Sequence, residues 1–467
     1  MPIQISFVNF RINPEAALKP FATQNMIFTT FLLIISILLI ILLSSKYKFS
    51  TFFVLIFVAI VAGLAAGMDG EAVVKALKTG FGETMGKVGL LVILGATLGI
   101  LLDKSNATIS LASYILSKTG ERYAPLAIAL VGFLVGLPIF CDSGFIVLIG
   151  LTLSLGQKLP NQKLALIGCL ATSLFGVHCL VPPHPGITAA ASTLNVDLGK
   201  AMLFGTFLAI PATAVAYFWT LYNPWVKVQN EQFPASNPAT IEQKTLPSPA
   251  RSFLPIIAPI ALIALKSVVS LYPDFVPVYL LKIIKFLGEP AAALLVGIGL
   301  AIPLFKKTEK RVINQILEDA IEKAGPILAV IAAGGAFGEI IKALDLGKVY
   351  GEVLHSQGLG LLIPFGLALI FKTAQGSSTV AAISAASICA PLLPALGLDS
   401  EWGRLLALSA IGAGSMVVSH ANDAYFWVIS RFGNLTISTT LRTFTPASFL
   451  MGITTLLLLY LVKWWVL

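Results

Sequence analysis

The sequence has little charge for its length. Lysine, arginine, aspartate and glutamate make up 11% of the 467 residues, whereas hydrophobic residues make up 57% and the mean hydropathy is +0.90. A soluble domain carries about 25% charged residues, because polar groups must cover its surface in water. The composition therefore excludes a soluble globular protein and indicates a chain that lies in lipid.

Cysteines and enzyme signatures are also scarce. The four cysteines all lie in apolar segments, with the spacing of neither a disulfide framework nor a zinc site: Cys141, Cys169, Cys179 and Cys389. We therefore expect no metal and no cofactor. An integral membrane enzyme using His178, His184 and Asp423 is the competing class, but no nucleophile elbow or HExxH motif is present. A channel is a third option, but the sequence has no motif that would form a ring-shaped selectivity filter.

Long apolar runs fill the rest of the sequence. They last about as long as the roughly 20 residues that a helix needs to cross a bilayer, and they do not alternate as barrel strands do. We expect about ten to thirteen crossings or partial crossings. The predicted fold class is an all-α polytopic membrane protein.

Basic residues outnumber acidic residues, 31 to 22, and the net charge is +9. They gather in short hydrophilic stretches such as 306–311, which is typical of cytoplasmic loops under the positive-inside rule. Because no basic stripe alternates with aromatic residues, we expect the lipid bilayer, and not nucleic acid, as the partner.

A polar segment rich in proline, serine and asparagine, 223–251, separates two related halves of the chain. A shift of 239 residues places 95–99 (GATLG) on 334–338 (GGAFG) and Asn195 on Asn434. A constant offset over more than one hundred residues indicates an internal repeat. We predict five parts: scaffold helices 1–80, repeat 81–222, surface linker 223–251, connecting scaffold helices 252–316 and repeat 317–467.

The two repeats are predicted to be inverted. Loop 157–163 (QKLPNQK) is basic, whereas its counterpart 396–402 (LGLDSEW) is acidic, so the two loops are expected on opposite sides of the membrane. Inverted repeats with interrupted helices near the midplane are frequent among secondary transporters.

Polar, glycine- or proline-rich stretches interrupt each repeat twice. They form two pairs: 136–144 with 372–379, and 178–186 with 419–423. A continuous helix does not accommodate Pro182, Pro183 and Pro185, since proline removes a donor and clashes with the preceding turn. Broken backbone at membrane depth is tolerated where it is buried in protein or lines a cavity. The four breaks are therefore the strongest functional signal.

The charged residues in the breaks have structural alternatives beside their functional interpretations. Asp142, among apolar residues, is a functional group or a member of an ion pair. Asp423 is a functional group or a helix cap. Lys372 faces an anionic substrate, or reaches the membrane interface from the end of a span.

The uncharged and titratable residues of the breaks have alternatives too. The run 376–379 is either close helix packing or a hairpin tip whose amides and hydroxyls hold a carboxylate. His184 and His420 either relay protons or form structural hydrogen bonds.

Together the four stretches resemble the gluconate permease family of bacterial proton symporters. Its G-(L/I)-P-(L/I)-F-F-(E/D)-x-G stretch corresponds to 136–144, its PPHPGP-like stretch to 182–187, its (R/K)-x-A-x-G-S-(A/S)-T-V-A stretch to 372–381, and its S-H-x-N-D stretch to 419–423. The resemblance covers nearly the whole chain from about residue 28. In this chain Asp142 follows Cys141 where Phe-Glu is common, Ile187 replaces a proline, and Lys372 replaces a frequent arginine, which leaves the exact substrate open.

This resemblance implies two inverted repeats with re-entrant hairpins and broken helices, an elevator-type fold, a homodimer and a place in the bacterial inner membrane. It implies proton-coupled uptake of gluconate or a related hydroxy carboxylate such as glycerate. D-serine, carried by one branch of the family, is an alternative substrate. Sodium coupling is a further alternative, because the hydroxyl- and carbonyl-rich breaks can ligate sodium as readily as they bind substrate.

The predicted substrate site draws on all four breaks. Lys372 and the hairpin amides would hold the carboxylate, hydroxyls and Asn422 would contact the substrate hydroxyls, and Asp142 or Asp423 would bind the coupled proton. The predicted site residues are Asp142, Ser143, His184, Lys372, Gln375, Gly376, Ser377, Ser378, Thr379, His420, Asn422 and Asp423.

Overall fold

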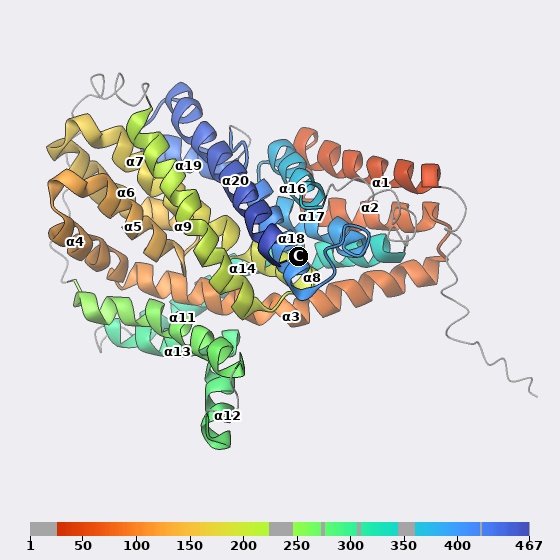
Figure 1. Cartoon of the computed structure of the whole chain (residues 1–467), viewed down its shortest axis with the longest axis horizontal. Coiled ribbons are helices and arrows are strands. Elements are labelled where there is room, and N and C mark those ends of the chain that lie inside the picture. Colours follow the sequence, from red (N-terminus) through yellow and green to blue (C-terminus); the bar gives the residue numbers. More distant parts are fainter. Residues whose placement is uncertain are drawn as a thin grey trace, which may run out of the picture.

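The protein is described by a computed structural model that covers residues 26–223, 246–271, 276–305, 310–343, 360–420 and 423–466. Throughout these ranges the regular structure is helical, with no strand (Figure 1). The prediction of an all-α fold is confirmed.

The first helices build one side of the molecule. They are α1 (Met26–Ile41) with the π-helical turn η2 (Leu42–Lys46), α2 (Thr51–Ala65), α3 (Gly70–Lys104) and α4 (Ala107–Thr119).

Helix α3 packs along α14 (Lys310–Ala343), and the two helices run antiparallel. Gly80, early in α3, meets Gly335, late in α14, whereas Ala96 and Ala324 share a cluster near the opposite ends. A Cβ atom on Gly80 would lie 2.9 Å from Ala336 Cα, so the close crossing requires glycine. The domain boundaries predicted at 80/81 and 316/317 fall inside these two helices, and the predicted division into five parts stays a prediction.

After α3 and after α14 the chain follows the same order of elements: a helical hairpin, a broken helix and a long helix. The first series is α5 (Ala124–Gly136), α6 (Cys141–Lys158), α7 (Lys163–Leu180), α8 (Pro185–Thr193) and α9 (Leu198–Tyr222). The second series is α16 (Leu362–Gln375), α17 (Ser378–Cys389), α18 (Glu401–Met416), α19 (Ala424–Phe432) and α20 (Ile437–Val466). Short 3-10 turns are η3 (Glu121–Tyr123), η4 (Pro160–Gln162), η7 (Ile302–Leu304) and η9 (Ala390–Leu392).

The two series are joined through α11 (Pro249–Leu271), α12 (Val278–Leu287) and α13 (Pro290–Ala301). Helix α12 is bent by 73° from the helical segment that follows it and projects away from the other helices (Figure 1). Residues 224–245 of the predicted linker lie outside the described residues.

Among the described residues, six helices are long and apolar enough to cross a membrane, or seven if the bent pair of α12 and α13 counts as one span. The remaining apolar segments are shorter helices, including α5, α16 and α17. Hydropathy cannot distinguish one long span from two short helices joined by a tight turn, which is why the sequence suggests more crossings than there are long helices.

Candidate functional site

All four breaks border one cavity of about 180 Å³. This volume is far above the roughly 10–15 Å³ that one water needs. Its lining residues are Phe140, Cys141, Asp142, Ser143, Phe175, His178, Pro185, Ile327, Ser377, Ser378, Thr379, Asp423, Ala424 and Tyr425. We call this space the break cavity.

Four helices begin at the break cavity. The first residues of α6, α8, α17 and α19, which are Cys141, Pro185, Ser378 and Ala424, all line it. Because the first backbone N–H groups of a helix have no partner within the helix and carry partial positive charge, helix N-termini favour anions. The arrangement therefore favours a negatively charged ligand.

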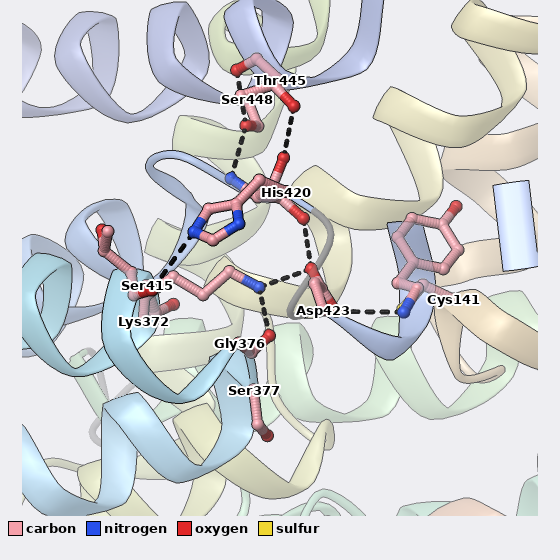
Figure 2. Close-up of polar contacts among 12 residues, drawn as sticks. Cys141, Lys372, Gly376, Ser377, Ser415, His420, Asp423, Thr445 and Ser448 are labelled. Atoms are coloured by element: carbon pink, nitrogen blue, oxygen red, sulfur yellow. Dashed lines mark hydrogen bonds and ion pairs between the residues drawn. The ribbon is translucent and has the colours of Figure 1, made fainter. Parts of the chain in front are cut away.

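A buried ion pair lies beside the break cavity (Figure 2). Lys372, in the last turn of α16, has a fully buried side chain, and its Nζ lies 2.5 Å from Asp423 Oδ2. The same Nζ donates to the carbonyl of Gly376 at 2.7 Å. Full burial rules out the alternative in which Lys372 reaches the membrane interface.

Asp423 has partners besides Lys372. The Ser419 hydroxyl donates to Oδ2, and the Tyr425 amide donates to Oδ1 at 3.0 Å. Asp423 is therefore the N-cap of α19 as well as a member of an ion pair. The interpretation of Asp423 as a helix cap is therefore correct, but a cap alone does not explain the ion pair with Lys372.

Helix α20 and the end of α16 hold the fourth break in place (Figure 2). Thr445 Oγ1 donates to the Ser419 carbonyl at 2.6 Å, and the Ser419 amide donates to Ser448 Oγ at 3.2 Å. His420 Nε2 lies 3.2 Å from the Thr373 carbonyl, and because a carbonyl only accepts, the ring N–H donates. His420 thus ties the break to α16, and it is not among the residues that line the cavity.

Aromatic rings form one wall of the break cavity. Phe175 and Tyr425 stack with centroids 5.6 Å apart, and Lys372 Nζ lies 5.3 Å from the Phe175 centroid. The Tyr425 hydroxyl donates to the Ala171 carbonyl at 2.9 Å. Sequence reasoning missed both rings, because only the folded chain brings α7 and α19 together.

His184 joins the first two breaks and does not line the cavity. Its ring is buried, and Nε2 donates to the Gly136 carbonyl at 2.7 Å, at the end of α5. This geometry favours the structural alternative for His184 over a place on the substrate. His178, whose ring lies 4.8 Å from that of His184, is the histidine that lines the cavity.

Replacing His184 by alanine is expected to destabilise the protein by about 1–3 kcal/mol, because the buried Gly136 carbonyl loses its partner. Thermal unfolding in detergent measures the loss. Thr206→Ala is the control, since its hydroxyl donates to the Met202 carbonyl of its own helix and joins no second element of the described chain. Equal melting temperatures for the His184 and Thr206 variants would contradict the joining role.

The other predicted site residues fall into two groups. Asp142, Ser143, Ser377, Ser378 and Thr379 line the break cavity, while Gln375 and Gly376 form the adjoining turn. Gly376 has φ +82°, a left-handed conformation that glycine adopts without strain. Asn422 lies outside the described residues. In the described part of the chain, no three histidine, cysteine, aspartate or glutamate side chains gather as a metal site would require.

Comparisons with known proteins agree with this architecture. The sequence model of the GntP family permeases matches residues 28–464. The high-affinity gluconate transporter of Escherichia coli K12 is 31% identical over 418 residues, which cover 88% of this chain and 94% of that protein. The Gnt-II system L-idonate transporter of the same strain is 32% identical over 427 residues, covering 90% and 95%.

A solved structure shares the fold. The YdaH transporter of Alcanivorax borkumensis superposes with a TM-score of 0.56 at 17% identity, over 86% of this chain and 90% of that one. With the family match over nearly the whole chain, these findings establish that the chain belongs to the GntP family of permeases, as a multi-pass transporter of the inner membrane and not an enzyme.

Proposed function

We propose that this permease takes up gluconate or a closely related hydroxy carboxylate, and that the proton gradient drives the uptake. The observation that carries the proposal is the buried ammonium of Lys372 beside a cavity at which four helices begin. A carboxylate there would meet a cation and the positive ends of several helices at once.

The neighbouring hydroxyls support a polyhydroxylated substrate. Ser143 on one hairpin and Ser377, Ser378 and Thr379 on the other line the same cavity. Hydroxyls both donate and accept, so they suit the hydroxyl groups of a sugar acid. The transporters for gluconate and L-idonate among the relatives support the same substrate class.

Proton coupling is supported by the charges around the break cavity. Asp142 and Asp423 are two carboxylates, and Lys372 supplies one positive charge, so the ionised site with neutral histidines carries −1. An anionic substrate would change the net charge of the site from −1 to −2. Like charges 4 Å apart repel by about 4 kcal/mol at an effective dielectric of 20. A proton that enters with the substrate removes that repulsion, and Asp142 or Asp423 would hold it.

The two helical series are proposed to be inverted repeats whose hairpins are re-entrant, in an elevator-type homodimer. The shared order of hairpin, broken helix and long helix supports the repeat. The inversion can be tested by introducing a single cysteine at position 158 or 397 and labelling it from each side of the membrane. Labelling of both from the same side would overturn it.

Uptake of radiolabelled gluconate into proteoliposomes tests the function. We expect saturable uptake driven by a pH gradient, inhibited by L-idonate and glycerate, and no stimulation by a sodium gradient. Protein-free liposomes are the control. Uptake that rises linearly with concentration, or that requires sodium, would contradict the proposal.

D-serine is the second candidate, and Asp142 is the observation that favours it. This carboxylate lines the break cavity and forms no ion pair with a lysine of the described residues, whereas Asp423 is paired with Lys372. An amino acid could place its ammonium on Asp142 and its carboxylate on Lys372. Inhibition of gluconate uptake by D-serine that exceeds inhibition by glycerate would favour this substrate.

A further inference from the structure

In this structure Lys372, the cation proposed to bind the substrate, is already bound to other groups of the protein. Lys372 Nζ donates to the Gly376 carbonyl at 2.7 Å and to Asp423 Oδ2 at 2.5 Å. The centroid of the Phe175 ring lies 5.3 Å from the same nitrogen. The side chain is fully buried. A substrate carboxylate therefore meets an ammonium whose charge Asp423 neutralises.

We propose that Asp423 is a built-in competitor for the substrate carboxylate, and that it takes up the coupled proton when the substrate replaces it on Lys372. This inference rests on the proposed function and assigns the proton carrier within it. The balance is simple: one proton from water forms an O–H bond at Asp423 Oδ2, and one substrate anion enters, so the net charge of the site is unchanged.

The partners of Asp423 suit both of its charge states. The ionised carboxylate accepts from the Ser419 hydroxyl and from the Tyr425 amide. After protonation Oδ1 still accepts from the amide, while Oδ2–H donates to Ser419 Oγ, because a hydroxyl can reverse its role by rotation. Protonated Asp423 thus leaves neither oxygen unsatisfied after it loses the lysine. This matters because an unpaired buried polar group costs about 1–3 kcal/mol.

Asp142 does not meet these conditions. Its side chain accepts from the Cys141 thiol, with Sγ 3.8 Å from Oδ1, and is in no ion pair within the described residues, so its protonation would release no cation. The titratable groups that face Asp423 are Cys141 and Asp142 on α6 and Cys179 on α7, with Tyr425 on α19. His178 on α7 lines the same cavity, and His420 lies three residues before Asp423. Lys372 is the cation bound directly to Asp423.

The exchange predicts proton uptake on binding. Purified protein in weakly buffered detergent, with a pH-indicator dye, should take up about one proton for each gluconate bound. By linkage, the gluconate Kd of the wild type should then rise about tenfold per pH unit wherever one proton is taken up for each gluconate bound. In Asp423→Asn the Kd should be independent of pH and proton uptake should vanish.

Asp142→Asn tests the rival proton carrier in the same cavity: the exchange predicts that this variant, at whatever affinity it retains, takes up one proton for each gluconate that it binds. Asp197→Asn is the matched control, because Asp197 is likewise the N-cap of a helix, α9, and its carboxylate accepts from the Lys200 amide away from the break cavity.

Ser419→Ala keeps the pair with Lys372 but removes the hydroxyl that bonds to Asp423 in both of its charge states. The Kd should therefore depend on pH over a narrower range than in the wild type. An unchanged pH dependence in this variant would overturn the assignment to Asp423 if Asp423→Asn does not fold.

The outcomes separate the inference from the function on which it rests. Gluconate binding by the wild type without proton uptake would overturn the exchange and leave carboxylate binding intact. Proton uptake that persists in Asp423→Asn, or that is lost in Asp142→Asn, would overturn the assignment to Asp423. Absence of binding of gluconate, L-idonate, glycerate and D-serine would overturn the proposed function, and the exchange with it.

Discussion

Replacing Lys372 by methionine is expected to reduce gluconate uptake roughly 100-fold, because hydrogen bonds to a charged group contribute up to about 3 kcal/mol. Methionine keeps an apolar stem in the fully buried space but supplies no cation. The variant also takes the cation away from Asp423, which costs about 3–5 kcal/mol of stability at a pH where the carboxylate stays ionised. Initial uptake rates in proteoliposomes and thermal unfolding measure the two effects separately.

Two variants separate loss of the site from loss of the fold. Lys200→Met breaks an exposed ion pair with Glu401, so it should cost no more than about 1 kcal/mol and leave uptake unchanged. The double variant of Lys372→Met with Asp423→Asn removes both buried charges and should recover stability without recovering uptake. Wild-type uptake by Lys372→Met would show that the lysine does not bind the substrate.

Replacing Gly186 by alanine is expected to lower uptake at least about tenfold, since about 1.4 kcal/mol at the site suffices for that change. Gly186 lies in the first turn of α8, where an added Cβ atom would lie 2.7 Å from Thr379 Cα on the second hairpin. Backbone cannot move aside as a flexible side chain can, so the hairpin tip must shift. Overpacking of this kind costs about 1–3 kcal/mol of stability.

Gly150→Ala is the control for this prediction. Gly150 lies within α6, and nothing lies within 4 Å of an added Cβ atom. Alanine is favoured over glycine inside a helix by up to about 1 kcal/mol, so stability should be equal or higher and uptake unchanged. Equal uptake rates for the Gly186 and Gly150 variants would show that the close contact between α8 and the second hairpin is not needed.

Local chemistry explains why three of the four breaks could be predicted from the sequence. Prolines at 182, 183 and 185 and glycines at 136 and 376 end or interrupt helices by rules that act over a few residues. The helices do stop at these places. A charged residue in an apolar stretch, such as Asp142 or Lys372, is a functional candidate by the same local reasoning.

The partners of these residues could not be predicted, because they are set by tertiary contacts. Nothing near Lys372 in the sequence indicates that its nearest carboxylate lies 51 residues away in Asp423. Phe175 and Tyr425 have the composition of ordinary apolar packing, and the structure alone places them on a cavity wall. Cys141, expected to be a small hydrophobic residue, also lines the cavity, whereas His184 serves the backbone of another helix.

A second cavity is an alternative to the break cavity as the place where the substrate binds. It has a volume of about 230 Å³ and lies between α3, α14 and the C-terminal ends of α8 and α17, where its lining residues include Lys87, Asn195, Glu339 and Ser387. Lys87 donates to Asn195 Oδ1 at 3.3 Å, and Lys342 contacts Glu339 at 3.3 Å. Its polar groups could also contact a hydroxy acid.

A structure of the protein determined with bound gluconate would show directly whether the break cavity holds the substrate. We expect the gluconate carboxylate within hydrogen-bonding distance of Lys372 Nζ, with the hydroxyls toward Ser143 and 377–379, and Asp423 displaced from the lysine. Gluconate in the second cavity, with the ion pair of Lys372 and Asp423 intact, would contradict this expectation.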